Sequence, residues 1–235
     1  MTAATKPKKF LNDPSQAVDE FITGQLLQFP NHLRKLSNHH VLLHSSFATT
    51  SSTSSHPNKH TVSLLSGGGS GHEPSHAGYI GSNLLSGAIL GGIFASPPVS
   101  SILAAIRAVT LPASQGGRGC LLIVKNYTGD RLNFGMACEM ANAEGRSVKM
   151  VVVADDCAIE RKKGITGARG VAGTVLVHKT VGAAAGRGMT LEEVAEVGKV
   201  VAKSVSSLGV ALDTVTIPGA ERVNDRLAGE GVMEV

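Results

Sequence analysis

The sequence predicts an α/β fold in which a parallel sheet carries helices on both faces. Three aliphatic runs, at 61–66, 119–126 and 147–156, have the length and composition of buried strands. Segments with helical spacing separate these runs, and such alternation is typical of parallel α/β sheets. Many of the 28 glycines stand at the ends of apolar runs, where α/β folds make their turns. Because only 3% of the residues are aromatic, the core must consist mainly of aliphatic side chains.

The N-terminal part of the chain predicts one helix, one strand and a loop. Asp13 can cap a helix and Pro14 fits its first turn, and apolar residues at helical spacing continue to about 29–30. The run "HVLLHSS" from His40 predicts a strand. The Ser/Thr-rich segment 47–60 shows no periodicity, and we expect a loop there.

The remaining elements follow the same alternation. After an apolar run at 87–95, helices are predicted at 97–109, 127–145, 171–188 and 190–209, and a last strand at 210–219. Thr190 and Glu193 predict a capping box for the last helix. Ligands bind such sheets beyond the carboxyl ends of the strands. The loops that follow Ser66, Asn126 and Asp155 are therefore the ones to search for a site.

Charge and hydropathy exclude two classes of partner. The formal net charge is +4, and the dense basic run at Lys6, Lys8 and Lys9 is typical of a solvated tail. A nucleic-acid-binding face would combine basic and aromatic residues, and aromatic residues are scarce here. No apolar stretch reaches the roughly 18 residues of a spanning helix, and no apolar leader is evident. We expect neither nucleic-acid nor membrane binding.

The cysteines indicate a reducing compartment. Cys120, Cys138 and Cys157 are odd in number, widely spaced and without a CxxC pair. Neither a disulfide framework nor a zinc site fits this pattern. We interpret them as reduced, packing side chains and expect a cytoplasmic protein.

The first candidate loop, "GGGSGHEP", combines backbone freedom with an imidazole. Glycines allow the backbone to approach a ligand, and exposed N–H groups can bind oxygen atoms. The loop lacks the Gly-Lys-Ser/Thr of a phosphate-binding loop and the spacing of a dinucleotide fingerprint. A plain tight turn is the alternative. His72 favours a site, because an imidazole that titrates near neutral pH can take a proton from a hydroxyl.

The second candidate loop, "KNYTGD", offers opposite charges. Lys125 lies at a strand end and supplies a charged donor, while Asp130 lies at a helix start and supplies an acceptor. A surface salt bridge for Lys125 and a helix cap for Asp130 are the alternatives. A polyhydroxylated ligand would use both groups, and both loops belong to neighbouring strand ends.

Other polar residues give weaker evidence for a functional site. His76 follows His72 by four residues, but the intervening proline argues against a metal pair on a helix. His178 is interpreted as a satisfied core histidine or a partner-facing one, and Asp155 and Asp156 as caps at a strand end rather than a Mg²⁺ corner. Cys157 is expected to pack rather than to act as a nucleophile. No metal site is predicted.

Several long stretches resemble one family. "LLSGGGSGHEPSHAGYIG", "LIVKNYTGDRLNFG" and "LGVALDTVTIPG" resemble the substrate-binding (DhaK) domain of dihydroxyacetone kinases, and "KKFLNDPSQAVDEFITG" and "SPPVSSILAAIRAV" are similar to it as well. The resemblance covers nearly the whole chain outside 47–60. It implies a three-layer α/β/α domain over 1–208 and the start of a smaller second α/β domain over 209–235.

The resemblance also implies an activity and a site. The family is a glycerone kinase family, which phosphorylates dihydroxyacetone to dihydroxyacetone phosphate with ATP. By motif, His72 would act in the proton transfer that frees the attacking hydroxyl. The residues that would line the substrate or bond its oxygens are Gly69, Ser70, Gly71, His72, Lys125 and Asp130.

The family has features beyond this sequence. A second histidine, in a Gly-Ile-His-Gly-Glu segment, binds the substrate covalently, and this sequence stops at Val235 before such a segment. Mg²⁺-ATP is held by a separate helical domain (DhaL), so no cofactor is expected on this chain. We expect a truncated chain without independent turnover. The alternatives are a noncatalytic ketose-binding or regulatory module and an inactive product. A homodimer, a DhaL partner and glyceraldehyde as a further substrate are implied.

Overall fold

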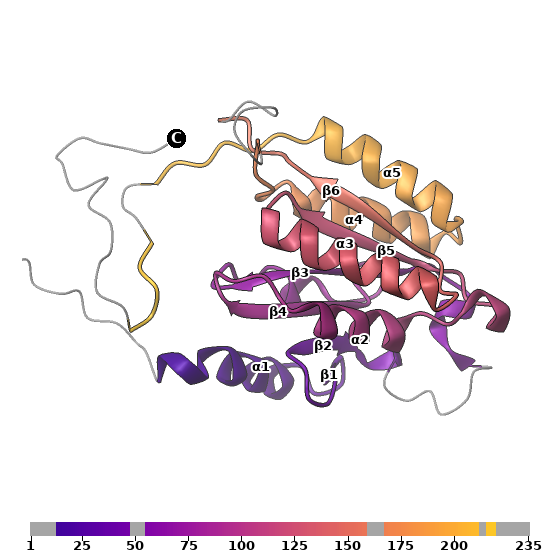
Figure 1. Cartoon of the computed structure of the whole chain (residues 1–235), viewed down its shortest axis with the longest axis horizontal. Coiled ribbons are helices and arrows are strands. Elements are labelled where there is room, and N and C mark those ends of the chain that lie inside the picture. The colour runs from indigo at the N-terminus through magenta and orange to yellow at the C-terminus, as the bar shows by residue number, and fades with distance from the viewer. Residues whose placement is uncertain (1–12, 48–54, 159–166, 212–214, 220–235) are drawn as a thin grey trace, which may run out of the picture.

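A six-stranded mixed sheet forms the centre of the molecule (Figure 1). The computed structural model describes residues 13–47, 55–158, 167–211 and 215–219. In spatial order the strands are β1 (Leu33–Lys35), β2 (Val41–His44), β4 (Gly87–Ile93), β3 (Ser63–Ser70), β5 (Cys120–Lys125) and β6 (Val148–Val153).

Four strands are parallel and two are not. β4, β3, β5 and β6 run parallel, which confirms the prediction that the runs at 61–66, 119–126 and 147–156 share one parallel sheet. β1 and β2 pair antiparallel with each other, and β2 pairs antiparallel with β4. The sheet is therefore mixed rather than wholly parallel. The short connection 36–40 explains the hairpin, because a parallel crossover needs a dozen or more residues.

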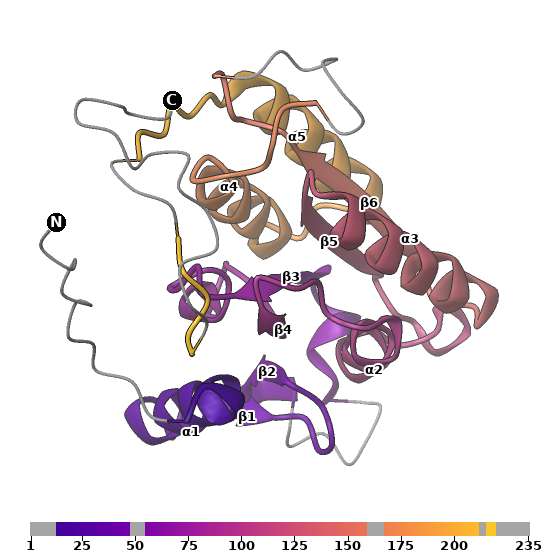
Figure 2. The ribbon, with the colours of Figure 1, turned by 60° about the vertical axis from the view of Figure 1, so that its left-hand side comes forward.

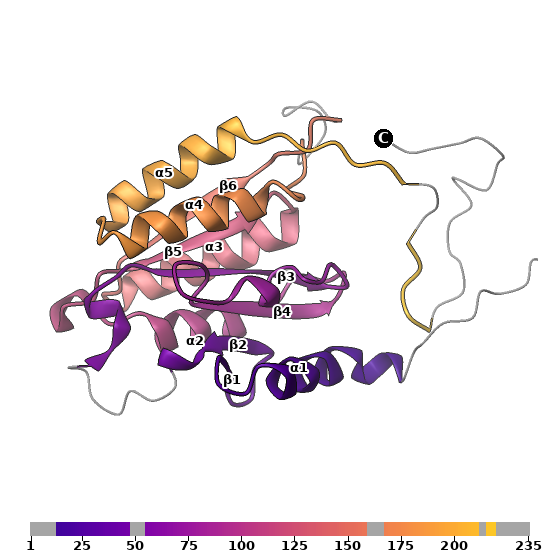
Figure 3. The ribbon, with the colours of Figure 1, turned by 180° about the vertical axis from the view of Figure 1, so that it is seen from behind.

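Helices cover both faces of the sheet, as the sequence predicts. α2 (Val99–Val109) and α3 (Thr128–Ala143) cover one face. α1 (Ala17–Gln28), α4 (Thr174–Gly186) and α5 (Leu191–Ser204) cover the other face. Figure 2 shows α2 and α3 on one side of the sheet and α4 on the other, and Figure 3 shows α4 and α5 from behind. The three-layer α/β/α architecture is confirmed.

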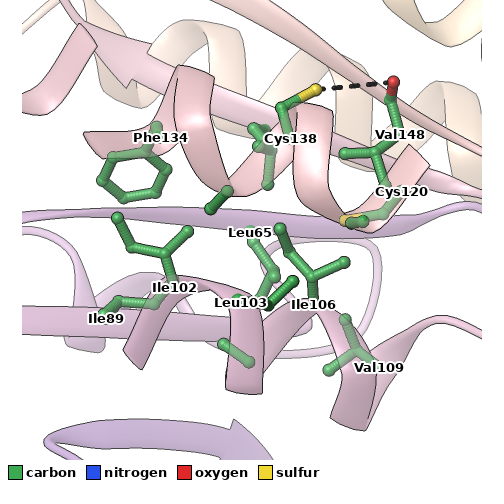
Figure 4. Packing of buried hydrophobic residues seen from close by; sticks show 14 of the residues in the cluster. Leu65, Ile89, Ile102, Leu103, Ile106, Val109, Cys120, Phe134, Cys138 and Val148 are labelled. Atoms are coloured by element: carbon green, nitrogen blue, oxygen red, sulfur yellow. Dashed lines mark hydrogen bonds between the residues drawn. The ribbon is translucent and has the colours of Figure 1, made fainter. Parts of the chain in front are cut away.

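Successive residues of β5 build the two cores. Leu122 packs among side chains of α2 and α3, whereas Leu121 and Ile123 pack among side chains of α4 and α5. Both faces of this central strand are buried, which accounts for its continuous apolar run. Figure 4 shows the cluster between α3 and α2, where Phe134 of α3 and Ile102 of α2 lie close to each other. The core is aliphatic, as the scarcity of aromatic residues requires.

The predicted helix starts are confirmed at both ends of the chain. Asp13 accepts a hydrogen bond from Ser15 N at 2.8 Å, and a short 3₁₀ turn (Pro14–Gln16) then leads into α1. At α5, Thr190 N donates to Glu193 Oε2 at 2.8 Å and Glu193 N donates to Thr190 Oγ1 at 3.3 Å. This reciprocal pair is the capping box.

Some predictions differ from the structure or lie partly outside it. The loop at 47–60 contains a 3₁₀ turn at Pro57–Lys59, and 48–54 lie outside the described residues. The described residues of 210–219 belong to no strand of the sheet, so the last predicted strand is not found there. The domain boundary at 208/209 stays a prediction. Among the described residues, no helix has the length and apolarity to cross a membrane.

The layered core predicts that replacing two different leucines by alanine has very different effects on the free energy of unfolding. Leu122 is fully buried in β5, so Leu122→Ala should lower the free energy of unfolding by about 2–5 kcal/mol through lost burial and a residual cavity. Leu132 on α3 is 66% exposed, and Leu132→Ala should change it by less than about 0.5 kcal/mol. Urea unfolding measures both values. Equal losses in the two variants would contradict the burial of Leu122 and the exposure of Leu132.

Candidate functional site

A cavity of about 440 Å³ lies where the parallel strands β3 and β5 end. Five of the residues predicted from the sequence line it: Gly69, Gly71, His72, Lys125 and Asp130. Among the described residues, Phe94, Ser96, Tyr127 and Val215 also line it. The carboxyl ends of two neighbouring strands therefore bring together residues that are about 60 positions apart in the sequence.

The glycine run is part of a strand rather than of a loop, contrary to the sequence prediction. β3 continues to Ser70, and Gly67 and Gly68 pair with β4. A β-carbon on Gly69 would lie 2.7 Å from Ala95 N. Gly71 has φ +104°, and a β-carbon there would lie 2.5 Å from Phe94 Cε1. These glycines let the end of β3 lie against the segment after β4, which closes one wall of the cavity.

Two polar groups of the glycine run, at Ser70 and Gly71, make hydrogen bonds within the protein. The Ser70 hydroxyl is buried and donates to Gly91 O at 2.8 Å, so the side chain holds β3 against β4 and does not line the cavity. Gly71 N donates to the Glu73 carboxylate at 3.0–3.1 Å. The cradle of free backbone N–H groups expected from the sequence is correspondingly smaller.

His72 is held in a form that can accept a proton. Its ring lies against Phe94, with centroids 5.1 Å apart. Burial is the main cause that lowers the pKa of His72 below 6.5, and the nearby Lys125 charge lowers it further. The Glu73 and Asp130 carboxylates oppose this shift. The imidazole is therefore neutral near pH 7, as a general base requires.

Lys125 and Asp130 bring opposite charges into a buried place. Lys125 is 8% exposed and Asp130 is 3% exposed. Burial lowers the pKa of Lys125, and the Asp130 and Asp155 carboxylates oppose that shift. Burial raises the pKa of Asp130, against the effects of a Ser96 hydrogen bond and of the Lys125 and His72 charges. Both groups face the cavity at a cost in solvation that a polar ligand can offset.

The alternative readings of these two residues do not describe what is seen. Asp130 lies inside the first turn of α3, and Tyr127 is the residue at the cap position. Lys125 is buried, so it is no surface salt bridge; its ammonium group lies 5.5 Å from the centre of the Tyr127 ring.

A buried pair of histidines lies next to the cavity, and no pattern in the sequence indicates that they pair. His76 Nδ1 lies 3.0 Å from His178 Nε2 and 3.2 Å from Ser66 Oγ. His178 is buried as predicted, but only one of its nitrogens is satisfied, because no described residue bonds Nδ1. Burial, followed by the Lys125 charge, lowers the pKa of His178 to about 3.

Asp155, just after the end of β6, makes hydrogen bonds within the protein. Asp155 accepts hydrogen bonds from Val171 N at 2.8 Å and Gly173 N at 2.7 Å, just before α4. This agrees with its interpretation as a cap. Cys157 is exposed, so the expectation that it packs is wrong. Within the described part of the chain, no group of three or more His, Cys, Asp or Glu could hold a metal ion.

A second cavity, of about 300 Å³, lies at the opposite end of β3. Its lining includes Leu64 near the start of β3, together with His44, Asn83 and Gly186. The described lining residues include no Lys, Arg, Asp or Glu, which distinguishes this cavity from the one beside Lys125 and Asp130.

Comparisons with known proteins agree on one family. The model of the Dak1 domain matches residues 24–235. The chain is 50% identical over 223 residues to the triokinase/FMN cyclase of Mus musculus, covering 95% of this chain and 36% of that protein. It is 45% identical over 211 residues to the dihydroxyacetone-binding subunit DhaK of a PTS-dependent dihydroxyacetone kinase of Listeria innocua, covering 90% of this chain and 60% of that subunit.

A solved structure shows the same fold. The dihydroxyacetone kinase of C. freundii superposes with a TM-score of 0.79 at 40% identity, covering 92% of this chain and 38% of that one. The chain thus spans between 36% and 60% of the length of these relatives.

The buried histidine His178 predicts a loss of stability in acid. The unfolded chain binds a proton at this side chain below about pH 6.5, whereas the folded chain does so only below about 3. The free energy of unfolding should therefore fall as the pH falls through this window, by up to about 1.4 kcal/mol per pH unit for this group. Urea unfolding at pH 7.5, 6.0 and 5.0 measures the slope.

The variant His178→Gln should show a shallower slope, by about one proton, whereas Leu132→Ala, at an exposed position that does not titrate, should keep the slope of the unchanged chain. A slope that His178→Gln leaves unaltered would contradict a neutral, buried His178.

Proposed function

The chain belongs to the Dak1 domain family, and from that premise we propose that its cavity binds dihydroxyacetone and presents one hydroxyl group of this ketose for phosphorylation to dihydroxyacetone phosphate. The observation that carries the proposal is the convergence of His72, Lys125 and Asp130 on one cavity. A base, a cation and a carboxylate together suit a small ligand that offers both hydroxyl donors and oxygen acceptors. The names of the relatives support the same ligand.

Binding would use the opposite charges as a donor and an acceptor. The Lys125 ammonium group donates a hydrogen bond to an oxygen of the ligand, and the Asp130 carboxylate accepts a hydrogen bond from a hydroxyl group of the ligand. Hydrogen bonds to charged groups contribute about 1.5–3 kcal/mol each. The Ser96 hydroxyl holds the carboxylate in place. Gly69 contributes backbone rather than a side chain, so the ligand can lie close to the end of β3.

His72 would take the proton from the hydroxyl that reacts. As the O–H bond breaks, the proton would pass to a ring nitrogen of the neutral imidazole. The oxygen would form the new bond to the γ-phosphorus of the donor while the bond from that phosphorus to the bridging oxygen breaks and ADP leaves. Phosphoryl transfer depends mainly on such positioning and on charge stabilisation. The lowered pKa of His72 keeps the imidazole unprotonated at neutral pH and somewhat below it.

The residues around the cavity do not fit Mg²⁺-ATP. Among the described residues, Asp130 is the one carboxylate that lines the cavity, and no group of three or more His, Cys, Asp or Glu side chains could hold the metal. We therefore assign the phosphoryl donor to another domain or subunit of the DhaL type, and this chain supplies the acceptor and the base.

The proposal extends to partners and place. A homodimer, a DhaL-type partner and glyceraldehyde as a further substrate belong to it, on the strength of the family. We also propose a cytoplasmic location, which the free thiols of Cys120, Cys138 and Cys157 support.

Substitutions should separate binding from proton transfer. Asp130→Asn removes a charged acceptor and should weaken dihydroxyacetone binding by about 10-fold to 100-fold in calorimetric titration. His72→Gln should leave the affinity within about threefold. With a DhaL-type domain and Mg²⁺-ATP, the same variant should lower formation of dihydroxyacetone phosphate by about 10²–10⁴-fold.

His44→Gln is the matched control, because this histidine lines the cavity at the opposite end of β3. It should change neither binding nor turnover. Binding that is intact while the unchanged chain supports no turnover with any DhaL-type domain would favour a noncatalytic ketose-binding module instead.

A further inference from the structure

The hydrogen bonds of Ser66 determine which nitrogen of His76 carries the proton. The Ser66 hydroxyl lies 2.6 Å from Ile123 O and has a single proton, which it donates to that carbonyl. Ser66 Oγ therefore presents lone pairs to His76 Nδ1, at 3.2 Å. Two facing lone pairs would repel at this distance in a buried site. The proton of the His76 ring consequently resides on Nδ1.

The second histidine completes this arrangement. His178 Nε2 lies 3.0 Å from the same Nδ1 atom of His76, with the rings edge to face at an angle of 72°. Because Nδ1–H of His76 is the donor, His178 Nε2 accepts. Both rings are buried, which favours the neutral form of each. His76 Nε2 is left with a bare lone pair, and none of the described residues hydrogen-bonds to it.

His76 Nε2 lies next to Gly68, the residue of β3 that precedes the cavity-lining Gly69. A β-carbon on Gly68 would lie 3.9 Å from His76 Nε2, 3.5 Å from Asp130 Oδ2 and 3.8 Å from Lys125 Cε. Lys125 and Asp130 both line the cavity, as does Gly69, the next residue of β3. His76 is 5% exposed. The position beside Gly68 is therefore surrounded by a fixed acceptor, a carboxylate and the stem of a cationic side chain.

We propose that His76 determines the specificity of the cavity by accepting a hydrogen bond from a hydroxyl group of the ligand beside Gly68. The inference rests on the proposed function and names the group that this position takes. The hydroxyl of a hydroxymethyl group can donate a hydrogen bond to His76 Nε2 or to the Asp130 carboxylate. A carbonyl, carboxylate or phosphate oxygen has no proton and would face two acceptors there. The position selects the free hydroxymethyl end of a ketose and rejects a phosphorylated end.

The proton position on His76 is tested without any ligand. Two-bond ¹H–¹⁵N correlation spectra of the labelled chain distinguish the tautomers, and the loss of signals in His76→Phe assigns them. The expected result is a protonated Nδ1 and a bare Nε2. Ser66→Ala should shift the shared proton and change the Nδ1 signal. A protonated Nε2 in the unchanged chain would overturn the proposal.

The selection of a hydroxyl group is tested with a pair of ligands. Hydroxyacetone lacks one hydroxyl group of dihydroxyacetone, and calorimetry gives the ratio of the two affinities. In the unchanged chain dihydroxyacetone should bind at least tenfold more tightly. In His76→Phe the ratio should fall at least threefold. An unchanged ratio would overturn the role of His76, even where both affinities fall because the core is disturbed.

Filling the position gives a test that leaves His76 in place. Gly68→Ala adds a methyl group at ordinary contact distances, so the fold should persist. It should weaken dihydroxyacetone binding at least tenfold. Gly92→Ala in β4 also meets one neighbour at an ordinary 3.8 Å and should keep the affinity within twofold. Equal affinities in the two variants would overturn the proposed position, whereas no binding by the unchanged chain would instead contradict the proposed function.

Discussion

The parallel pairing of β3 with β5 is the constraint on which the site depends. The register joins Ser66 to Ile123, and β5 therefore ends at Lys125 beside the last glycines of β3. Both strands are buried on their two faces, so the pairing is held by two aliphatic cores. A slip by one residue would turn every side chain of one strand to the opposite core. The core thus determines the geometry of the cavity.

Burial then sets the chemistry of the polar groups at this strand end. Burial favours the neutral form of each group, so it lowers the pKa values of His72 and Lys125 and raises the pKa of Asp130. The opposite charges of Lys125 and Asp130 work against each other's shifts and keep both groups suited to hydrogen bonding, whereas the Lys125 charge lowers the pKa of His72 further. A ligand with donors and acceptors replaces the water that these groups lost on folding. The polar groups of the site have thus lost their water and are held in fixed orientations for hydrogen bonding.

Much of this could be predicted from the sequence, because the signals are local. Aliphatic runs and capping residues indicate strands and helices by themselves, as at β5 and at the capping box of Thr190. Lys125 and Asp130 could be placed together because parallel strands end at a common edge. The glycine run was misplaced in a loop, since its packing against the segment after β4 depends on a partner strand.

The remaining features depend on contacts between distant residues. His76 and His178 are 102 positions apart, and no spacing rule relates them. Phe94 and Val215 line the cavity because of the way the chain returns to it, not because of their residue type. The short strand β1 has little apolar pattern and is defined by its hairpin with β2. Such features follow from topology, which a single sequence specifies only indirectly.

In the proposed function, a ketose binds at the carboxyl end of β3. Titration of the ¹⁵N-labelled chain with dihydroxyacetone, followed through backbone amide signals, measures where it binds. We expect the largest shifts at Gly69, His72 and Asp130, with little change at Asn83 and Gly186 in the cavity at the opposite end of the strand. Shifts that concentrate at Asn83 and Gly186, or no shifts at all at millimolar dihydroxyacetone, would contradict this expectation.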